Sequence, residues 1–271
     1  FVIAIVVWIF ALSQFTRLPQ LALESVEIVG ADPEIENDLR AAAFGALRGK
    51  YLGIFSKSNS FIYPSDSIED AARNASPRII TIDAERDGAK KIVLKIVEKT
   101  PVAIVCAGLP DWKDSQLIFG SSDDCYRVDA DGYLFMKDIS SPETSHLGRY
   151  YIPGLVENEI DGDGNFIGKY AASTTEFVSL RKFYEGAKAN GIAARAILVK
   201  GDGEYELYAD NHSTSTIVIY FNERNSLDDE SVNLISFWKN MEQTARSEGE
   251  SLNFESIDLR YGPNVFYRAG K

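Results

Sequence analysis

The feature that most constrains the fold is a pair of β-favouring runs that meet at a turn. Residues 78–86 read RIITIDAER, and residues 91–99 read KIVLKIVEK. Asp87 and Gly88 lie between the two runs, and an Asp-Gly pair in this setting is a strong hairpin signal. The sequence therefore predicts an antiparallel pair of strands here.

A strand and two helices are predicted before this hairpin. Residues 24–32, ESVEIVGAD, read as a strand followed by a turn. Residues 32–49 read as a helix with Asp32 as its N-cap, because Asp is favoured there and a proline follows it at the first helical position. A second, short helix is predicted over 67–75 with Asp66 as its cap. The predicted order is strand, helix, helix, strand, strand.

The second half of the chain alternates short β-favouring runs with two helical segments. The helical segments, 173–191 and 226–249, each carry an apolar stripe and end at a glycine. Residues 143–168 read as a long polar connection. The β-favouring runs cover 101–107, 125–130, 132–136, 194–201, 204–210, 215–222 and 257–268. The prediction is an α+β chain in which a mixed or antiparallel sheet, backed by helices, forms the second half.

The first residues, FVIAIVVWIFALS, contain twelve apolar or small positions in a row. A full membrane span needs roughly 18 to 20, and we expect the run to continue before Phe1. A signal peptide and a core helix are the alternatives. The sequence thus predicts a transmembrane anchor over residues 1–20, with a small domain over 21–99 and a β domain over 100–271. The protein would cross the cell membrane once, with the bulk of the chain extracytoplasmic.

Composition excludes several classes of function. The net charge of -12 argues against nucleic acid as a partner, because phosphate binding needs a basic stripe. Two histidines leave little room for a metal site or a catalytic triad. Asp161 to Asn165, DGDGN, has the spacing of a calcium loop, but Phe166 and Ala172 stand where that loop needs Gly and Glu. We predict no catalytic residues, no metal, no cofactor and no small-molecule substrate.

Cys106 and Cys125 are the only cysteines, and each lies at or beside a predicted strand. Outside the cytoplasm such a pair is expected to form a disulfide, whereas in a reducing compartment both would be buried thiols. Given the predicted anchor, a disulfide is the favoured interpretation.

Several short stretches together resemble the FtsQ/DivIB family of bacterial cell-division proteins. VEIVG (26–30) and PRII (77–80) resemble strands of the family's POTRA domain. VEKTPVAIV (97–105) resembles the junction with its β domain, and IDLRY (257–261) is similar to the penultimate strand of that domain. Each motif alone is weak, but their order along nearly the whole chain is fairly specific.

The resemblance implies a non-enzymatic scaffold of the division machinery, made of a single-span anchor, a POTRA domain and a β domain. Such proteins bind the small coiled-coil partners FtsB and FtsL and help to control septal peptidoglycan synthesis. Carried onto this sequence, the partner-binding residues are Arg260, Tyr261, Val265, Phe266 and Tyr267. In this interpretation Arg260 meets a partner carboxylate, and the last strand pairs with a partner strand.

Three other interpretations stay open. The terminal hairpin can be a closed part of the core with no partner. The chain can also be a POTRA-bearing transport or assembly component, although the alternating strands of a membrane β-barrel are lacking from the sequence. An extracytoplasmic enzyme or ligand-binding protein would need convergent polar groups in a pocket.

Overall fold

The computed structural model describes residues 2–114, 116–118, 124–139, 144–156, 166–210, 215–249 and 251–270. The chain divides between Lys99 and Thr100 into unit 1, Phe1–Lys99, and unit 2, Thr100–Lys271. The described residues form five α-helices and several sheets, of which the largest is mixed, so the chain is α+β.

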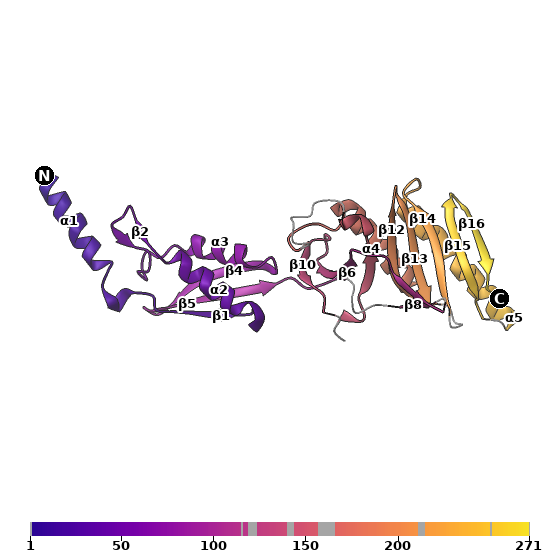
Figure 1. Ribbon diagram of the computed structural model, residues 1–271, viewed down its shortest axis with the longest axis horizontal. Coiled ribbons are helices and arrows are strands. Elements are labelled where there is room, and N and C mark those ends of the chain that lie inside the picture. Colours follow the sequence, from indigo (N-terminus) through magenta and orange to yellow (C-terminus); the bar gives the residue numbers. More distant parts are fainter. Residues whose placement is uncertain are drawn as a thin grey trace. The chain divides into compact units, whose positions relative to one another are not determined.

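A three-stranded sheet with two helices forms the centre of unit 1 (Figure 1). Its strand order is β1-β5-β4, in which β5 pairs in parallel with β1 and antiparallel with β4. The bounds are β1 Ser25–Val29, α2 Pro33–Ala46, α3 Ser65–Ala75, β4 Ile79–Asp87 and β5 Lys91–Glu98. The predicted hairpin and the two predicted helices are therefore present.

Local signals explain where the helices of unit 1 begin. The Asp32 carboxylate accepts a 2.9 Å hydrogen bond from the backbone N–H of Glu34, which confirms its predicted role as N-cap of α2. The α2 stripe, Ile35, Leu39 and Ala43, is buried in the core of the unit. The prediction for α3 was wrong by two residues, because this helix begins at Ser65 and Asp66 lies in its first turn.

The first helix corrects a prediction. Helix α1, Val2–Phe15, has 14 residues, or about 21 Å at 1.5 Å per residue, against a hydrocarbon core of about 30 Å. Among the described residues, no helix combines the length and the apolar character needed to cross a membrane. The predicted transmembrane anchor over residues 1–20 is therefore wrong, and so is the predicted single-pass location in the cell membrane with an extracytoplasmic bulk.

A small hairpin lies beside α1 in unit 1. Its strands are β2 Lys50–Tyr51 and β3 Phe55–Ser56, and the 3₁₀ turn η1, Pro19–Leu21, follows α1. Ser13, the one buried residue of α1, donates a 3.2 Å hydrogen bond from its hydroxyl to the carbonyl of Ile54. This bond ties α1 to the hairpin.

Unit 2 contains a nine-stranded mixed sheet in the order β10-β9-β6-β11-β12-β13-β14-β15-β16. Three neighbouring pairs are parallel: β6 with β11, β11 with β12, and β14 with β15. The bounds are β6 Ala103–Cys106, β9 Cys125–Val128, β10 Leu134–Lys137, β11 Gly148–Tyr151, β12 Ala194–Gly201, β13 Glu204–Asp210, β14 Thr216–Asn222, β15 Phe254–Tyr261 and β16 Asn264–Ala269.

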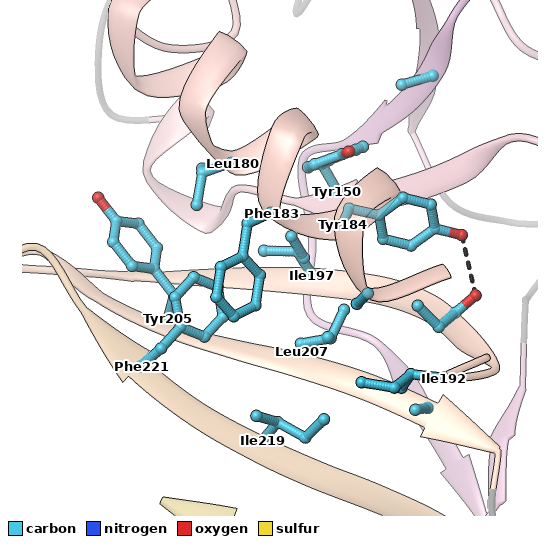
Figure 2. Packing of buried hydrophobic residues seen from close by; sticks show 14 of the residues in the cluster. Tyr150, Leu180, Phe183, Tyr184, Ile192, Ile197, Tyr205, Leu207, Ile219 and Phe221 are labelled. Atoms are coloured by element: carbon cyan, nitrogen blue, oxygen red, sulfur yellow. Dashed lines mark hydrogen bonds between the residues drawn. The ribbon is translucent and has the colours of Figure 1, made fainter. Parts of the chain in front are cut away.

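Helices α4, Thr174–Ala189, and α5, Leu227–Glu248, cover one face of this sheet. Aromatic side chains fill the layer between α4 and the strands, as Figure 2 shows. The rings of Phe183 and Phe221 stack with centroids 4.1 Å apart. The Tyr184 hydroxyl donates a 3.0 Å hydrogen bond to the Ala194 carbonyl, which satisfies a buried polar group.

Strand β11 lies inside the stretch that was predicted to be a polar connection. It occupies the interior of the sheet, between β6 and β12, and is parallel to both. All four of its residues are buried, including Tyr150 and Tyr151, and the 3₁₀ turn η3, Pro153–Val156, follows. The predicted connection over 143–168 is therefore wrong for these residues.

The other face of the sheet carries a disulfide and a small hairpin. Cys106 on β6 and Cys125 on β9 lie opposite each other in the register and form a disulfide. The Arg149 Nη1 atom lies 3.9 and 3.7 Å from their two sulfurs. The hairpin, β7 Asp111–Lys113 with β8 Gln116–Ile118, places buried Leu117 in the same apolar cluster.

Candidate functional site at the C-terminal sheet edge

The two edges of the nine-stranded sheet differ in their covering. At one edge, residues 168–169 cover the start of β10: the N–H of Leu134 donates to the Lys169 carbonyl and the N–H of Gly168 donates to the Leu134 carbonyl, both at 2.8 Å. At the other edge, β16 pairs with β15 and with no further strand of the described chain. Figure 1 shows β16 as the outermost strand of unit 2. An open edge of this kind is a template for pairing with another chain.

The turn between β15 and β16 is held in place by helix α5. Gly262 has a φ of 69°, a left-handed conformation that glycine adopts without steric cost. The Asn233 side chain of α5 donates a 3.2 Å hydrogen bond to the Gly262 carbonyl. The hairpin is therefore anchored at its tip, which gives its edge a defined geometry.

Three aromatic side chains of this hairpin are more than half exposed: Tyr261 by 60%, Phe266 by 56% and Tyr267 by 51%. Tyr261 and Phe266 meet edge to face with ring centroids 5.3 Å apart. Tyr267 contacts Phe237 of α5, at 5.4 Å between centroids. Because neighbouring residues of a strand point to opposite faces, Phe266 and Tyr267 present apolar surface on both sides of the edge.

Arg260 lies beside these aromatic residues, but acidic side chains of the same chain bind its guanidinium. Its Nε and Nη2 donate to the two carboxylate oxygens of Asp258, at 2.9 and 2.6 Å. Its Nη1 donates to Glu204 of β13 at 3.1 Å. The guanidinium also lies 5.1 Å from the centre of the Tyr220 ring on β14. Arg260 thus connects β15 to β13 across the strand that separates them.

The pKa shifts in this network follow from its contacts. Burial opposes ionisation of Asp258, but hydrogen bonds from Arg260 outweigh it and hold the pKa of Asp258 below its ordinary value. Hydrogen bonds to Asp258 and Glu204 raise the pKa of Arg260. Both shifts favour the charged forms of Asp258 and Arg260, so the two side chains form an ion pair rather than an acid–base pair poised for proton transfer.

A groove of about 640 Å³ lies between the second half of α5 and β16. Met241 and Ala245 of α5 line it from one side, and Phe254 and Tyr267 line it from the sheet. A strand added to β16 would place every other side chain on the face where this groove opens. The groove therefore adds to the edge of β16 a surface that can distinguish between side chains of an added partner strand.

The five residues predicted to bind a partner all lie on the β15–β16 hairpin. Three are the exposed aromatic residues, Val265 is half-buried against the core, and Arg260 belongs to the internal ion cluster. Sequence reasoning missed Glu204 and Tyr220, which are distant in the sequence and gave no local signal. It could have found Asp258, because residues two apart on a strand share a face.

Among the described residues, no three His, Cys, Asp or Glu side chains converge on a site that could hold a metal ion. The DGDGN stretch at 161–165 lies outside the described residues. Comparison of the sequence with models of known protein families and with curated proteins finds no match.

Proposed function

We propose that this chain is a non-enzymatic scaffold of the bacterial division machinery, similar to FtsQ/DivIB proteins. In this role it binds FtsB- and FtsL-like coiled-coil proteins and helps to couple assembly of the division site to septal peptidoglycan synthesis. The observation that carries the proposal is the open edge of β16, where Tyr261, Phe266 and Tyr267 are exposed beside unpaired backbone.

The proposed binding mode is addition of a partner strand to β16. Main-chain hydrogen bonds supply affinity without regard to sequence, and alternate side chains supply specificity. On one face a partner side chain would meet Phe266 and Tyr261, and on the other it would meet Tyr267 and the groove beside α5. Exposed aromatic residues at the centre of such a surface are the usual energetic anchors of an interface.

The covered edge at β10 supports this choice of surface. Both edges would promote aggregation if left open, and the chain covers the start of one of them, at Leu134, with its own residues 168–169. Leaving β16 open has a cost in solubility, which a dedicated partner would remove. The order of elements in unit 1, strand, two helices and two strands, is consistent with the POTRA domain that the resemblance implies.

Arg260 takes a different part in this proposal from the one that the sequence suggested. Its donors already bind Asp258 and Glu204, so a partner carboxylate would have to compete with both. We assign it the role of holding the terminal hairpin on the sheet, while the aromatic residues make the contact.

The test is a pull-down of the FtsB-like protein from the same organism with the purified chain. Phe266→Glu should weaken capture by at least about tenfold, because it replaces an aromatic anchor with a charge. The matched control is Ile139→Glu, which makes the same kind of change at an apolar residue, 76% exposed, just after β10. Equal capture by both variants and the wild type would refute strand addition at β16.

A further inference from the structure

A second surface, in unit 1, has the features of a binding groove. It has a volume of about 600 Å³ and lies between the end of α2 and the β2–β3 hairpin. Leu23 and Leu47, which are buried, and Phe44, which is partly buried, give it an apolar lining. Arg48, Ser56 and Ser58 supply its polar groups.

The charges around this groove are unlike those of the rest of the chain. The protein has 40 acidic and 28 basic residues, yet residues 39–65 contain four basic residues, Arg40, Arg48, Lys50 and Lys57, and no Asp or Glu. A stretch of this length with no acidic residue leaves a local positive potential on an otherwise acidic protein.

Three of these cations also lack ionic partners. Arg48, Lys50 and Lys57 form no ion pair with any acidic side chain that the structure describes. By contrast, lysines on the sheet of the same unit are paired: Lys91 contacts Glu27 and Asp87, both at 2.7 Å. Arg48 lines the groove, and Lys50 and Lys57 are next in the sequence to its lining residues Gly49, Ser56 and Ser58.

The tip of the β2–β3 hairpin carries an apolar residue in an unfavourable conformation. Leu52 is 90% exposed and has a φ of 48°, next to Gly53 with a φ of 72°. These two residues are the centre of a turn that the Ile54 N–H closes on the Tyr51 carbonyl at 2.9 Å. Positive φ at both central positions favours Asn-Gly, and a leucine there is a steric outlier. The Leu52 side chain buries little apolar surface within the protein. Residues in unfavourable backbone conformations are concentrated at functional sites.

We propose that this groove and hairpin tip bind an acidic, amphipathic segment of another protein. An apolar side chain of that segment would enter the groove, a second would contact Leu52, and its carboxylates would face Arg48, Lys50 and Lys57. Ser56 and Ser58 share one hydrogen bond, at 2.9 Å, so one of the two hydroxyl protons can be donated to a carboxylate or a backbone carbonyl. The proposal is independent of the edge of β16.

The concave shape of the site favours a protein segment over a lipid surface. A bilayer presents a broad, flat array of headgroups, which could meet the exposed cations but could not fill a groove lined by Leu23 and Phe44. A peptide can do both, because its charged and apolar side chains alternate on a scale of a few ångströms.

The test uses short synthetic peptides that share the same leucines and differ in having Glu, Gln or Lys at the remaining positions. Binding to the full chain is measured by fluorescence anisotropy. The Glu peptide should bind at least about tenfold more tightly than the Gln peptide, and the Lys peptide should not bind, since opposite charges attract and like charges repel. Equal binding of the Glu and Gln peptides would overturn the proposal.

Variants of the protein locate the contact. Arg48→Glu with Lys57→Glu should abolish binding of the Glu peptide, whereas Lys182→Glu with Lys239→Glu, the same change of charge at exposed positions of unit 2, should leave it unchanged. Leu52→Asn suits the turn and preserves the fold, yet it should weaken binding several-fold.

The same variants separate a protein partner from a membrane. Vesicles of phosphatidylglycerol are added to the wild type and to the Arg48→Glu, Lys57→Glu protein. If the vesicles bind the wild type and this variant abolishes that binding but spares the peptide, the surface contacts lipid and the proposal is wrong. Loss of peptide binding in the Lys182→Glu, Lys239→Glu control would also overturn it, because the effect would then be one of net charge.

Discussion

Glu230 makes the stability of unit 2 depend on pH in an unusual direction. Its side chain is fully buried in the first turn of α5, where it accepts hydrogen bonds from the Asn222 N–H at 3.0 Å and the Asn225 amide at 3.2 Å. Burial raises its pKa from an ordinary value of 4.5 to about 7, although both hydrogen bonds act to lower it. Asp258 and Glu204 add to the increase through their negative charges.

A raised carboxyl pKa means that the folded state binds the proton more tightly than the unfolded state. Between pH 4.5 and about 7 the folded chain holds more protons, so its free energy of unfolding falls as the pH rises. The contribution is fully present below the unfolded pKa and is lost by the time the pH has passed the folded pKa. The difference of 2.5 units, about 7 minus 4.5, corresponds to about 3 kcal/mol.

The variant Glu230→Gln removes this dependence while preserving the shape of the protonated acid. Its amide oxygen can still accept from the Asn222 N–H, and the Asn225 amide can turn to accept from the new NH₂ group. The two proteins should have similar stability at about pH 4.5. At about pH 8 the variant should be more stable by about 3 kcal/mol, because only the wild type must bury a charge.

The assay is urea unfolding of both proteins across this pH range. Trp238, a buried residue of α5, reports on unit 2 once Trp8 and Trp112 are replaced by Phe. Other groups titrate in the same range, but they are common to both proteins and cancel in the difference. A difference between variant and wild type that stays constant with pH would show that the pKa of Glu230 is the same in the folded and unfolded states, and the reasoning would be wrong.

Three further changes test other parts of the structure by chemical denaturation. Arg260→Gln should destabilise unit 2 by about 1 to 2 kcal/mol, because it leaves the partly buried carboxylate of Asp258 without its cation. Replacing Cys106 and Cys125 by Ser should lower the free energy of unfolding by about 3 kcal/mol in the chain-entropy account, since the bridge closes a loop with a separation of 19 residues. Leu52→Asn should raise stability by about 0.5 to 1 kcal/mol through relief of its left-handed conformation; an unchanged or lower denaturation midpoint would argue against strain there.

Elements fixed by local chemistry could be predicted from the sequence. The β4–β5 hairpin follows from an Asp-Gly turn between two β-favouring runs, and α2 follows from a capping aspartate with a proline behind it. The turn between β9 and β10 follows from residues 129–132, DADG, in which Gly132 adopts a left-handed φ of 84°. In each case the signal and the structure that it specifies lie within a few residues.

Strand β11 could not be predicted in this way, although it lies in the interior of the sheet of unit 2, between β6 and β12. It has four residues, Gly148–Tyr151, and lies in a polar stretch with no alternation to mark it. Its partners, β6 and β12, are each more than 40 residues distant, as the contacts of Tyr150 with Val105 and Ile197 show. Parallel pairing at this distance is decided by the completed core, and local propensity does not contain that information.

In the candidate site, too, some features follow from local sequence and others depend on residues far away in the chain. The exposed terminal strand is evident from its apolar residues and its turn, and the structure places it at an open edge. The state of Arg260 is not evident, because Glu204 lies 56 residues earlier in the chain and reaches it only across β14. Whether a charged residue in a strand can bind a partner depends on whether a residue far away in the sequence already binds its charge.

The two proposed binding surfaces, the edge of β16 and the groove of unit 1, should respond differently to salt, because the cation at the first has acidic partners and those at the second do not. At the β16 edge the nearby cation, Arg260, is already neutralised by Asp258 and Glu204, so backbone bonds and aromatic contacts are left to bind a partner. In unit 1, Arg48 and Lys50 are exposed and have no acidic partner in the described chain. Raising the ionic strength from about 0.05 to about 0.5 M shortens the range of charge interactions severalfold. Binding at the groove of unit 1 should therefore weaken strongly with salt, whereas strand addition at β16 should persist, because hydrophobic contacts and main-chain hydrogen bonds are little screened.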